Sequence, residues 1–380
     1  MANRYEVIVV GIGGMGSAAA YHLARRGRRV LGLERFTIPN EMGSSHGISR
    51  IIRLAYFEHP SYVPLLRRAY ELWRQLEREH GEQILHMTGC IHVGAPGTQV
   101  YDGCLRSCAE HGLEHEVLSS DEVMRRFPAY RLPPGTGAVL EAEGGFLVPE
   151  KCILAHANGA RGAGAELHEE ERVVGWESSD GGVSVRTDRA TYEADRLVLT
   201  AGSWNGKLAP SLATRLQPER QVLAWLQVSR PELFEQAAFP VFVMEVPEGM
   251  YYGFPLFDDG PPGLKLGRFH HLQEQVDPDL LDRGGAGQAD EDLLRAFATR
   301  YLPDGAGPAL EMKVCMFTNT PDEHFVIDLH PGEPRVVLGA GFSGHGFKFC
   351  SVVGEILADL AGEGGTRHRI DLFEAARFST

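Results

Sequence analysis

The chain has 380 residues, 43% of them hydrophobic, which suits roughly two or three structural units with buried cores. Its 51 acidic and 37 basic residues give a formal charge of −14, which argues against nucleic acid or an anionic membrane as the main partner. No basic-then-apolar leader precedes the first apolar run, and no apolar stretch reaches the roughly 18 residues of a membrane helix. We therefore expect a soluble cytoplasmic protein with reduced thiols. None of the six cysteines forms a CxxC pair, so we expect no metal site.

The stretch YEVIVVGIGGMGSAAAYHLARRGRRVLGLE, residues 5–34, predicts a strand, a glycine turn, a helix and a second strand. Gly11, Gly13 and Gly16 form a GxGxxG motif directly after the first strand. Gly11 permits the tight turn, Gly13 lets a pyrophosphate approach the backbone, and Gly16 allows close packing of helix on strand. Glu34 ends the second strand, where a carboxylate can accept a hydrogen bond from a ribose hydroxyl. This unit predicts dinucleotide binding but does not distinguish NAD from FAD.

Further elements follow along the chain. Residues 61–80 predict an amphipathic helix, and a second helix begins near Pro149 after a turn. Residues 195–206 predict a strand that enters a small-residue turn. LDRGGAGQAD, residues 281–290, predicts a flexible surface loop. Residues 336–350 again predict a strand and a glycine-rich turn, which leads into a helix, so the last segment is expected to rejoin the dinucleotide domain.

The middle segments are richer in short strands and turns, which predicts a second, mainly antiparallel sheet. The expected fold class is therefore α/β (α+β), with a Rossmann-type dinucleotide-binding domain and a separate substrate domain. The first domain would comprise residues 1–85, 146–216 and 315–380, and the second residues 86–145 and 217–314. Both domains would be discontinuous.

The stretch EMKVCMFTNTPDEHFVID, residues 311–328, begins like a strand and places Cys315 among alternating residues. From these residues alone, Cys315 is most simply a small buried hydrophobe, because free cysteine is commonly buried. The dense polar cluster Asp322, Glu323 and His324 follows it.

Six segments together resemble the monomeric sarcosine oxidase family of flavoproteins, which also contains N-methyltryptophan oxidase. The segments are GIGGMGSAAAYHLARRG, GSSHGISRIIRLAY, YYGFPLF, LKLG, KVCMFTNTPDEHFVIDLHP and AGFSGHGFKF. The resemblance spans nearly the whole chain, and its last two segments are highly specific. It implies that FAD is the cofactor and that Cys315 holds it through a thioether to the flavin 8α-methyl carbon.

The resemblance also implies roles for residues of the GSSHGISRIIRLAY and AGFSGHGFKF segments. Arg50 would be a basic residue near the flavin, and His46 is a further candidate, although a loop histidine that caps the next helix is an equal alternative. Arg53 and Lys348 would bind a substrate carboxylate, with Lys348 also near the cofactor; on a helix Arg50 and Arg53 would share a face. From the sequence alone, the alternative is that Arg50 and Arg53 are both solvated and bind nothing. Ser45 and Gly344, in the same two segments, are cofactor-binding candidates.

Three more residues are implied at the active site. Lys265, between two leucines of a predicted strand, would lie beside the flavin ring and promote the reaction with oxygen, whereas a strand lysine usually faces solvent. Tyr252 matches the family's active-site tyrosine, and Tyr251 would pack. The family has a histidine soon after the lysine, but KLGRFHH has one extra residue, so His270 is chosen with His271 as the alternative.

The implied activity is FAD-dependent oxidation of the secondary amine of an N-methyl or N-alkyl amino acid by oxygen, which gives an aldehyde, an amino acid and hydrogen peroxide. The expected protein is a monomer without nucleic-acid or membrane partners. Alternatives are an oxidase of cyclic or glycated amino acids, such as pipecolate or fructosyl amino acids, a dehydrogenase that reduces a quinone or a protein, a noncatalytic flavin-binding redox protein, and an NAD-dependent dehydrogenase. The DDGPP segment before Lys265 is longer than the family's loop, which leaves the preferred substrate open.

Overall fold

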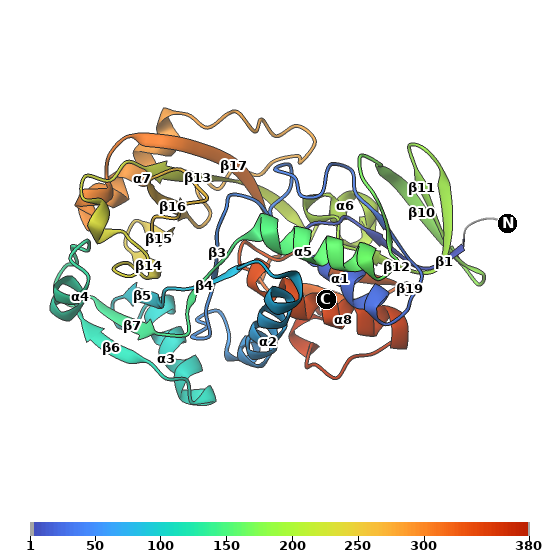
Figure 1. The fold of residues 1–380 in the computed structure, drawn as a ribbon, viewed down its shortest axis with the longest axis horizontal. Helices are drawn as coiled ribbons and strands as arrows, with labels where there is room; N and C mark the ends of the chain where they lie inside the picture. The colour runs from blue at the N-terminus through green and yellow to red at the C-terminus, as the bar shows by residue number, and fades with distance from the viewer. Residues whose placement is uncertain (1–3, 379–380) are drawn as a thin grey trace.

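The computed structural model describes residues 4–378, which form two large sheets, a small third sheet and the helices that cover them (Figure 1). In Figure 1 the first sheet lies toward the N-terminus on the right, and the second lies on the left. Strands from alternating stretches of the chain contribute to the two large sheets. No helix among residues 4–378 is long and apolar enough to cross a membrane.

The first sheet has eight strands and a largely parallel centre. Its strands are β1 (Arg4–Val10), β2 (Val30–Leu33), β9 (Glu166–His168), β10 (Val173–Ser179), β11 (Gly182–Thr187), β12 (Thr191–Leu199), β18 (Val326–His330) and β19 (Glu333–Ala340). The order is β10-β11-β12-β1-β2-β9, and β19 extends the sheet from β12. β1 is parallel to β2 and to β12, with Val9 opposite Gly32 and Val198. Longer helices cover one face of the sheet, and turns around Ala209, Leu212 and Leu216 cover the other, so the strands are buried on both sides, which explains their continuous apolar runs.

The second sheet also has eight strands, in the order β17-β13-β16-β15-β14-β5-β7-β6. These are β5 (Cys90–Gly94), β6 (Glu116–Ser119), β7 (Gly137–Glu141), β13 (Gln217–Leu226), β14 (Val241–Val246), β15 (Gly249–Phe254), β16 (Leu264–Arg268) and β17 (Ala309–Asn319). Every pair is antiparallel except β5 with β14, so the predicted mainly antiparallel sheet is confirmed. We propose the domain division stated above, although its boundary at 314/315 falls within β17.

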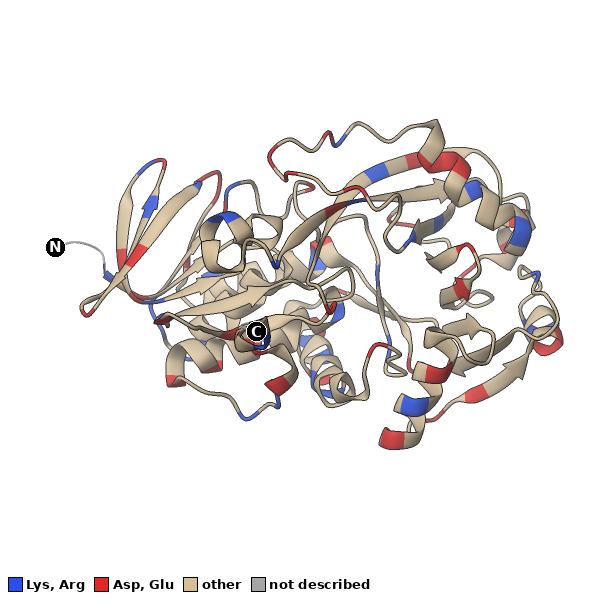
Figure 2. Ribbon diagram, turned by 180° about the vertical axis from the view of Figure 1, so that it is seen from behind, with Lys and Arg blue, Asp and Glu red and all other residues tan. Residues whose placement is uncertain are grey.

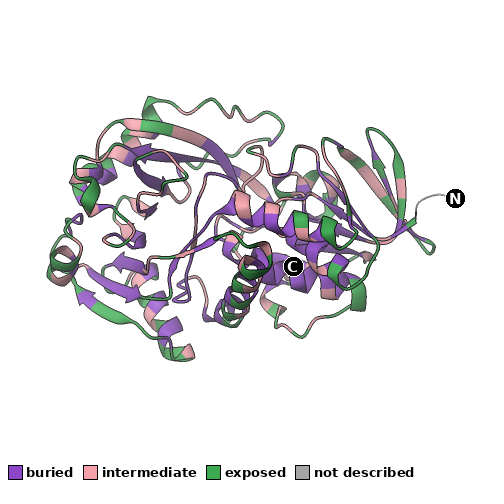
Figure 3. Ribbon diagram, in the orientation of Figure 1, coloured by how far each residue is buried: buried purple, intermediate pink, exposed green. Residues whose placement is uncertain are grey.

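The third sheet contains β3 (Arg50–Ile52), β4 (Leu85–Met87) and β8 (Gly145–Leu147). The helices are α1 (Gly14–Arg25), α2 (Val63–His80), α3 (Gln99–His111), α4 (Ser120–Arg126), α5 (Pro149–Gly162), α6 (Asn205–Leu208), α7 (Gln288–Tyr301) and α8 (Cys350–Glu363). α1 packs against α5 and α8, and Figure 3 shows many buried residues in this layer. The predicted helices at 61–80 and from Pro149 are confirmed as α2 and α5.

Two local predictions differ from the structure. Arg50 begins the strand β3 and Arg53 lies just beyond it, so the two arginines do not share a helix face. Residues 281–290 form a loop only as far as Gly287, because α7 begins at Gln288. Asp290 is buried there, since it pairs with Arg220 and His271. Figure 2 shows acidic and basic residues interspersed on the outer helices and loops of both halves, so the charges that matter for a ligand are those of the local site.

Candidate active site

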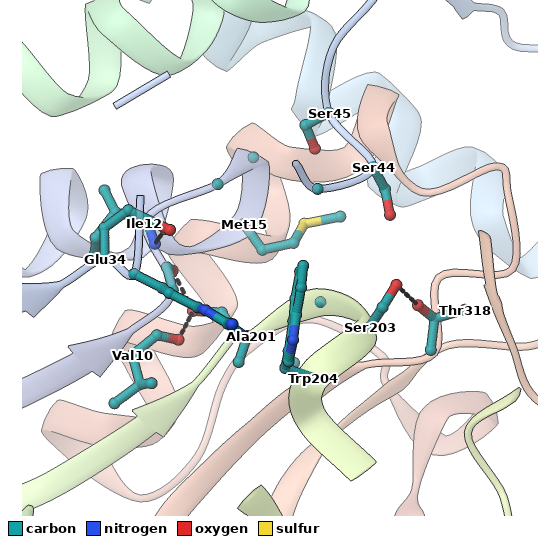
Figure 4. A pocket seen from close by; sticks show the side chains of 18 of the residues that line it. Val10, Ile12, Met15, Glu34, Ser44, Ser45, Ala201, Ser203, Trp204 and Thr318 are labelled. Atoms are coloured by element: carbon teal, nitrogen blue, oxygen red, sulfur yellow. Dashed lines mark hydrogen bonds between the residues drawn. The ribbon is translucent and has the colours of Figure 1, made fainter. Parts of the chain in front are cut away.

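A long pocket begins where β1 ends and α1 starts, at the glycine motif (Figure 4). Gly11 has φ +85°, and a Cβ there would lie 2.6 Å from the Thr200 carbonyl oxygen. A Cβ on Gly16 would lie 1.8 Å from the Gly11 carbonyl oxygen, whereas one on Gly13 would have no atom within 4 Å. No side chain caps the N-terminus of α1. The motif therefore leaves open space beside the first-turn N–H groups, which is an anion-binding arrangement.

Glu34 lines the same pocket and is buried. Its Oε2 accepts a hydrogen bond from the Ile12 backbone N–H (2.8 Å) and its Oε1 one from the Phe36 N–H (3.0 Å) (Figure 4). Burial raises the pKa of Glu34, and these N–H donors oppose that rise. The carboxylate thus holds the glycine turn against the end of β2, and its contact with a ribose remains a prediction.

Segments far apart in sequence form the facing walls of the pocket. Ser44 and Ser45 lie on the loop before β3 and face Ser203 and Thr318 across the cavity (Figure 4). The hydroxyls of Ser203 and Thr318 are hydrogen-bonded to each other at 2.8 Å. Gly344, with φ +75°, lies on the same pocket wall. The predicted strand and small-residue turn at 195–206 are confirmed as β12 and the 3₁₀ turn at Gly202–Trp204.

Cys315 lies on β17, opposite Gln221 of β13, and is 2% exposed. It packs with Leu223 and Trp225, and the next three residues of β17 line the pocket. Burial raises the pKa of the thiol, although the nearby charges of Arg50 and Lys265 lower it. Cys315 is therefore both a buried side chain and a neighbour of the pocket.

Lys265 faces inward from β16 and is 2% exposed. Its Nζ donates to the Gly47 carbonyl oxygen (2.6 Å), the Ser49 carbonyl oxygen (2.7 Å) and the Ser49 Oγ (2.8 Å). Nζ also lies 4.3 Å from the centre of the Phe254 ring. Burial, and then the charge of Arg50, lowers the pKa of Lys265. Three acceptors nevertheless match the three N–H donors of an ammonium, and the solvent-facing alternative is excluded.

His46 and Arg50 flank the segment that Lys265 holds. Arg50 lines the pocket and donates to the Ser44 and Ser49 carbonyl oxygens, each at 2.9 Å. His46 is 1% exposed, and neither ring nitrogen has a hydrogen-bond partner among the described residues. Burial lowers its pKa to about 3, with a smaller contribution from Arg50. The structure gives no support to the alternative that His46 caps a helix. His46 is instead a neutral ring whose Nδ1 and Nε2 have no partner among the described residues.

Arg53 is buried in a second polar cluster, next to the loop that precedes α8. Its Nη2 donates to both carboxylate oxygens of Glu58 (2.7 and 2.8 Å), and its Nη1 donates to the Ala55 carbonyl oxygen (3.0 Å). The guanidinium lies 4.3 Å from the centre of the Tyr56 ring. Burial raises the pKa of Glu58, but Arg53 outweighs this and holds it below its usual value. The alternative of two solvated arginines is therefore wrong for Arg53.

Lys348 belongs to the same cluster, on the 3₁₀ turn Phe347–Phe349. Its Nζ donates to the His345 carbonyl oxygen (2.7 Å) and lies 5.3 Å from the centre of the Tyr56 ring. Burial, and then the charge of Arg53, lowers its pKa to about 7, while Glu58 opposes this change. The cluster thus contains two buried cations and one carboxylate.

The histidine pair after β16 divides between two environments. His270 has a left-handed φ of +52°, and its two ring nitrogens bond to Glu219 (3.1 Å) and Glu323 (2.9 Å). These bonds raise its pKa to about 10, so the ring is an imidazolium at neutral pH. His271 is fully buried and bonds to Asp290 near the start of α7 (2.8 Å). Since the Glu323 carbonyl oxygen accepts a bond from the His345 ring (3.0 Å), His270 is linked to the Lys348 cluster.

The two adjacent tyrosines face opposite ways, as strand alternation requires. Tyr251 is 2% exposed and stacks on Phe297, with ring centroids 4.0 Å apart, so its predicted packing role is confirmed. Tyr252 packs near Cys315 and against Phe269, whose ring centroid is 5.2 Å away. Burial raises the pKa of the Tyr252 hydroxyl, so it is a neutral donor.

The chain is similar to known flavoprotein oxidases along nearly its whole length. Residues 6–360 match the family described as "FAD dependent oxidoreductase". The chain belongs to the FAD dependent oxidoreductase family. It is 43% identical to a monomeric sarcosine oxidase of Streptomyces avermitilis, over 100% of this chain and 99% of that protein. It is 35% identical to an N-methyl-L-tryptophan oxidase of Yersinia pestis, over 98% and 99%. The chain is also similar to the solved structure of NikD, which is described as an unusual amino acid oxidase. The match has a TM-score of 0.83 and 27% identity, and it covers 98% of this chain and 97% of the NikD chain.

The residues present fit the cofactor of an FAD dependent oxidoreductase. Gly13 leaves room for a pyrophosphate beside an uncapped helix N-terminus. His46, next to the pocket-lining Ser44 and Ser45, has two buried ring nitrogens without a partner among residues 4–378. The pocket is lined by segments from the beginning, the middle and the end of the chain.

Sequence reasoning missed several residues of this site. Glu58 lies five residues after Arg53 in RLAYFE, and only its acidity could have marked it as a partner. Glu150 accepts hydrogen bonds from the Gly47 N–H (2.7 Å) and the Ile48 N–H (3.1 Å), although about a hundred positions separate it from them. Phe269 gave no sequence signal, yet its ring lies against Tyr252.

Proposed function

We propose that the protein is an FAD-dependent oxidase of N-methyl or other N-alkyl amino acids, in which a secondary amine lies close to a carboxylate. The observation that carries this proposal is the charge of the Arg53 cluster. Arg53 and Lys348 both lie against one tyrosine ring, beside Glu58. Two buried basic side chains that converge in this way can both donate hydrogen bonds to one anion. A substrate carboxylate supplies that anion, in agreement with the sarcosine and N-methyltryptophan oxidases among the relatives.

The reaction removes two electrons and two protons from the amine, one proton from C–H and one from N–H. FAD, when bound, supplies the electron acceptor and passes the electrons to oxygen, which leaves as hydrogen peroxide. Arg53 binds the substrate carboxylate through its guanidinium and Lys348 through its ammonium, which fixes the amine in one position. The resulting imine hydrolyses to an aldehyde and an amino acid.

The other candidate residues act on protonation and charge. His270, which Glu219 and Glu323 hold in place, shapes the site and favours the neutral amine that can be oxidised. Tyr252 shapes the site and donates a hydrogen bond. Lys265 provides a fixed positive charge where oxygen is reduced, and Arg50 provides another at the pocket wall. Cys315 attaches FAD covalently, because it precedes the pocket-lining residues of β17.

A screen for hydrogen peroxide tests the activity. Purified yellow protein is expected to form peroxide with N-methyl amino acids faster than with pipecolate or a fructosyl amino acid. Peroxide formation only with the cyclic or glycated compounds would replace this substrate class, and none with any amine would favour the noncatalytic redox protein.

Arg53→Ala tests the role of the carboxylate. Loss of a charge-assisted contact typically costs about 1.5–3 kcal/mol, so KM for the acid is expected to rise roughly 10- to 150-fold. The neutral amide of the same substrate is the control, and its KM is expected to change far less. Equal losses for acid and amide would show that Arg53 does not face the carboxylate.

A further inference from the structure

A second buried carboxylate lies behind Arg53. Glu141 is the last residue of β7 and is 2% exposed. Its Oε2 accepts hydrogen bonds from the backbone N–H groups of Leu54 (2.8 Å) and Ala55 (3.1 Å). These are the two residues that follow Arg53, so one carboxylate oxygen of the second sheet holds the backbone of the segment that carries the guanidinium.

The peptide held in this way also makes direct contact with Arg53. The Ala55 N–H donates to Glu141, and the Ala55 carbonyl oxygen accepts from the Arg53 Nη1 at 3.0 Å. The same carbonyl oxygen accepts from the Cys104 Sγ of α3 at 3.2 Å. The position of Ala55 therefore determines where the guanidinium lies, and Glu141 is the charged group that holds Ala55.

The other oxygen of Glu141 is engaged by His92. The His92 Nε2 lies 2.9 Å from Glu141 Oε1, and His92 has no exposed surface. Since the carboxylate accepts here, Nε2 carries the proton, and the opposite ring nitrogen has no partner among the described residues. His92 is one strand away from Glu141, on β5, and so fixes the carboxylate rotamer.

Cys90, His92 and Glu141 also have the residue types of a metal site, because their ligand atoms lie within 4.8 Å of one another. Hydrogen bonds argue against that reading. Both Glu141 oxygens already accept from N–H donors, and the His92 nitrogen nearest to the carboxylate is one of those donors. A metal ion would have to break the contact that holds Leu54 and Ala55 in place.

We propose that Glu141, held by His92, is a positioning residue that places Arg53 for recognition of the substrate carboxylate. This inference rests on the proposed role of Arg53, since it concerns the same site. Glu141 does not touch the substrate, so its loss acts on carboxylate recognition alone. A displacement of about 1 Å of a binding group can cost a hundredfold, and a disordered Ala55 peptide permits displacements of that size.

Butyrate and butyramide provide an unreactive probe, because butyrate has the skeleton of N-methylglycine with a methylene in place of the amine. Their dissociation constants are measured from the change in the visible absorbance of the yellow holoenzyme. In Glu141→Leu the Kd of butyrate is expected to rise about 10- to 100-fold, while that of butyramide changes less than about threefold. Glu141→Gln keeps an acceptor for both N–H groups and is expected to stay within about threefold of the wild type for both.

Glu77→Leu is the matched control. Glu77 Oε1 accepts from the backbone N–H groups of Ile84 and Leu85, each at 2.9 Å, which is the same kind of contact away from Arg53. This variant is expected to lose stability without changing the Kd of butyrate. If Glu141→Leu does not fold, Glu141→Asp is used, since its shorter side chain reaches the Leu54 N–H poorly, and its butyrate Kd is expected to rise at least about fivefold.

The outcomes separate two failures. If the wild type binds butyrate and butyramide equally, the proposed function of Arg53 is wrong. If the wild type prefers butyrate, and the folded Glu141 variants keep that preference with an unchanged Kd, only the positioning role is wrong. Equal weakening of both probes would make Glu141 a general structural residue. One metal ion per chain that is lost in Glu141→Leu would replace the positioning role by a metal site.

Discussion

Lys348 makes the proposed carboxylate site sensitive to pH near neutrality. Its pKa is lowered to about 7, first by burial and then by Arg53. The protonated ammonium attracts an anion, so the affinity for butyrate is expected to be complete below pH 7 and to fall as the pH rises through 7. Butyrate is ionised throughout this range, because carboxyl groups titrate at about pH 4. His345 has a pKa of about 4 and His270 has a pKa of about 10, so neither titrates near pH 7.

The size of the effect follows from the contact that is lost. A hydrogen bond to a charged group contributes about 1.5–3 kcal/mol, or roughly 10- to 150-fold in Kd. Bound butyrate therefore raises the pKa of Lys348 by about one to two units. Because butyrate binding and Lys348 protonation are linked, this pKa shift sets the largest possible change in the Kd of butyrate. Between about pH 6 and pH 9 the Kd of butyrate is expected to rise about 8- to 60-fold.

Absorbance titration of the holoenzyme at several pH values measures this directly. Butyramide is the ligand control, since its affinity is expected to be flat, and Lys348→Met is the protein control, since its weak butyrate affinity should not depend on pH. A wild-type Kd for butyrate that is constant from pH 6 to 9 would refute the reasoning. So would a pH dependence that persists unchanged in Lys348→Met.

Three other predictions concern the cofactor. Acid-precipitated wild-type protein is expected to stay yellow and to exceed the chain mass by one FAD. Cys315→Ala should bind flavin when folded but lose it on denaturation. Flavin that washes off the denatured wild type would contradict the covalent attachment. Lys265→Met, which is neutral and similar in length, should slow reoxidation of the reduced flavin by oxygen at least about 100-fold, because one preorganised charge is lost. Anaerobic reduction of the flavin by substrate should slow at most about tenfold, and stopped-flow absorbance measures both rates. Flavin reoxidation at the wild-type rate would exclude this role. Gly16→Ala should lower the free energy of unfolding by about 1–3 kcal/mol in urea, because its Cβ would lie 1.8 Å from a carbonyl oxygen. Gly13→Ala has open space and should weaken only FAD binding, so equal unfolding free energies for the two variants would contradict the packing argument.

The elements that the sequence predicted correctly are those whose signals are local. Strand, glycine turn and helix follow one another within residues 5–34, and each step depends only on neighbouring backbone geometry. The alternation around Cys315 predicted β17 for the same reason. The family resemblance added the chemistry, but the roles of individual residues at the site stay predictions.

The elements that sequence reasoning missed depend on contacts between distant segments. Lys265 was expected near a flavin, yet its three acceptors come from the loop at 47–49, which no local pattern connects to β16. The choice between His270 and His271 depends on the left-handed backbone at His270, which turns one ring toward Glu323 and the other toward α7. Residues 288–290 were assigned to a loop because the glycines before them dominate the composition of that stretch.

The order of strands in the first sheet has a consequence for biosynthesis. Val9 pairs with Val198, and Leu199 pairs in turn with Leu338, so the centre of this sheet joins the beginning, the middle and the end of the chain. Pairings so distant in sequence form late, because the chain entropy of closing large loops must be overcome first. The nucleotide-binding unit at residues 5–34 is made first by the ribosome, but its sheet is incomplete until β19 has emerged. Because residues near the end of the chain also line the pocket, the complete pocket exists only after nearly the entire polypeptide has been translated.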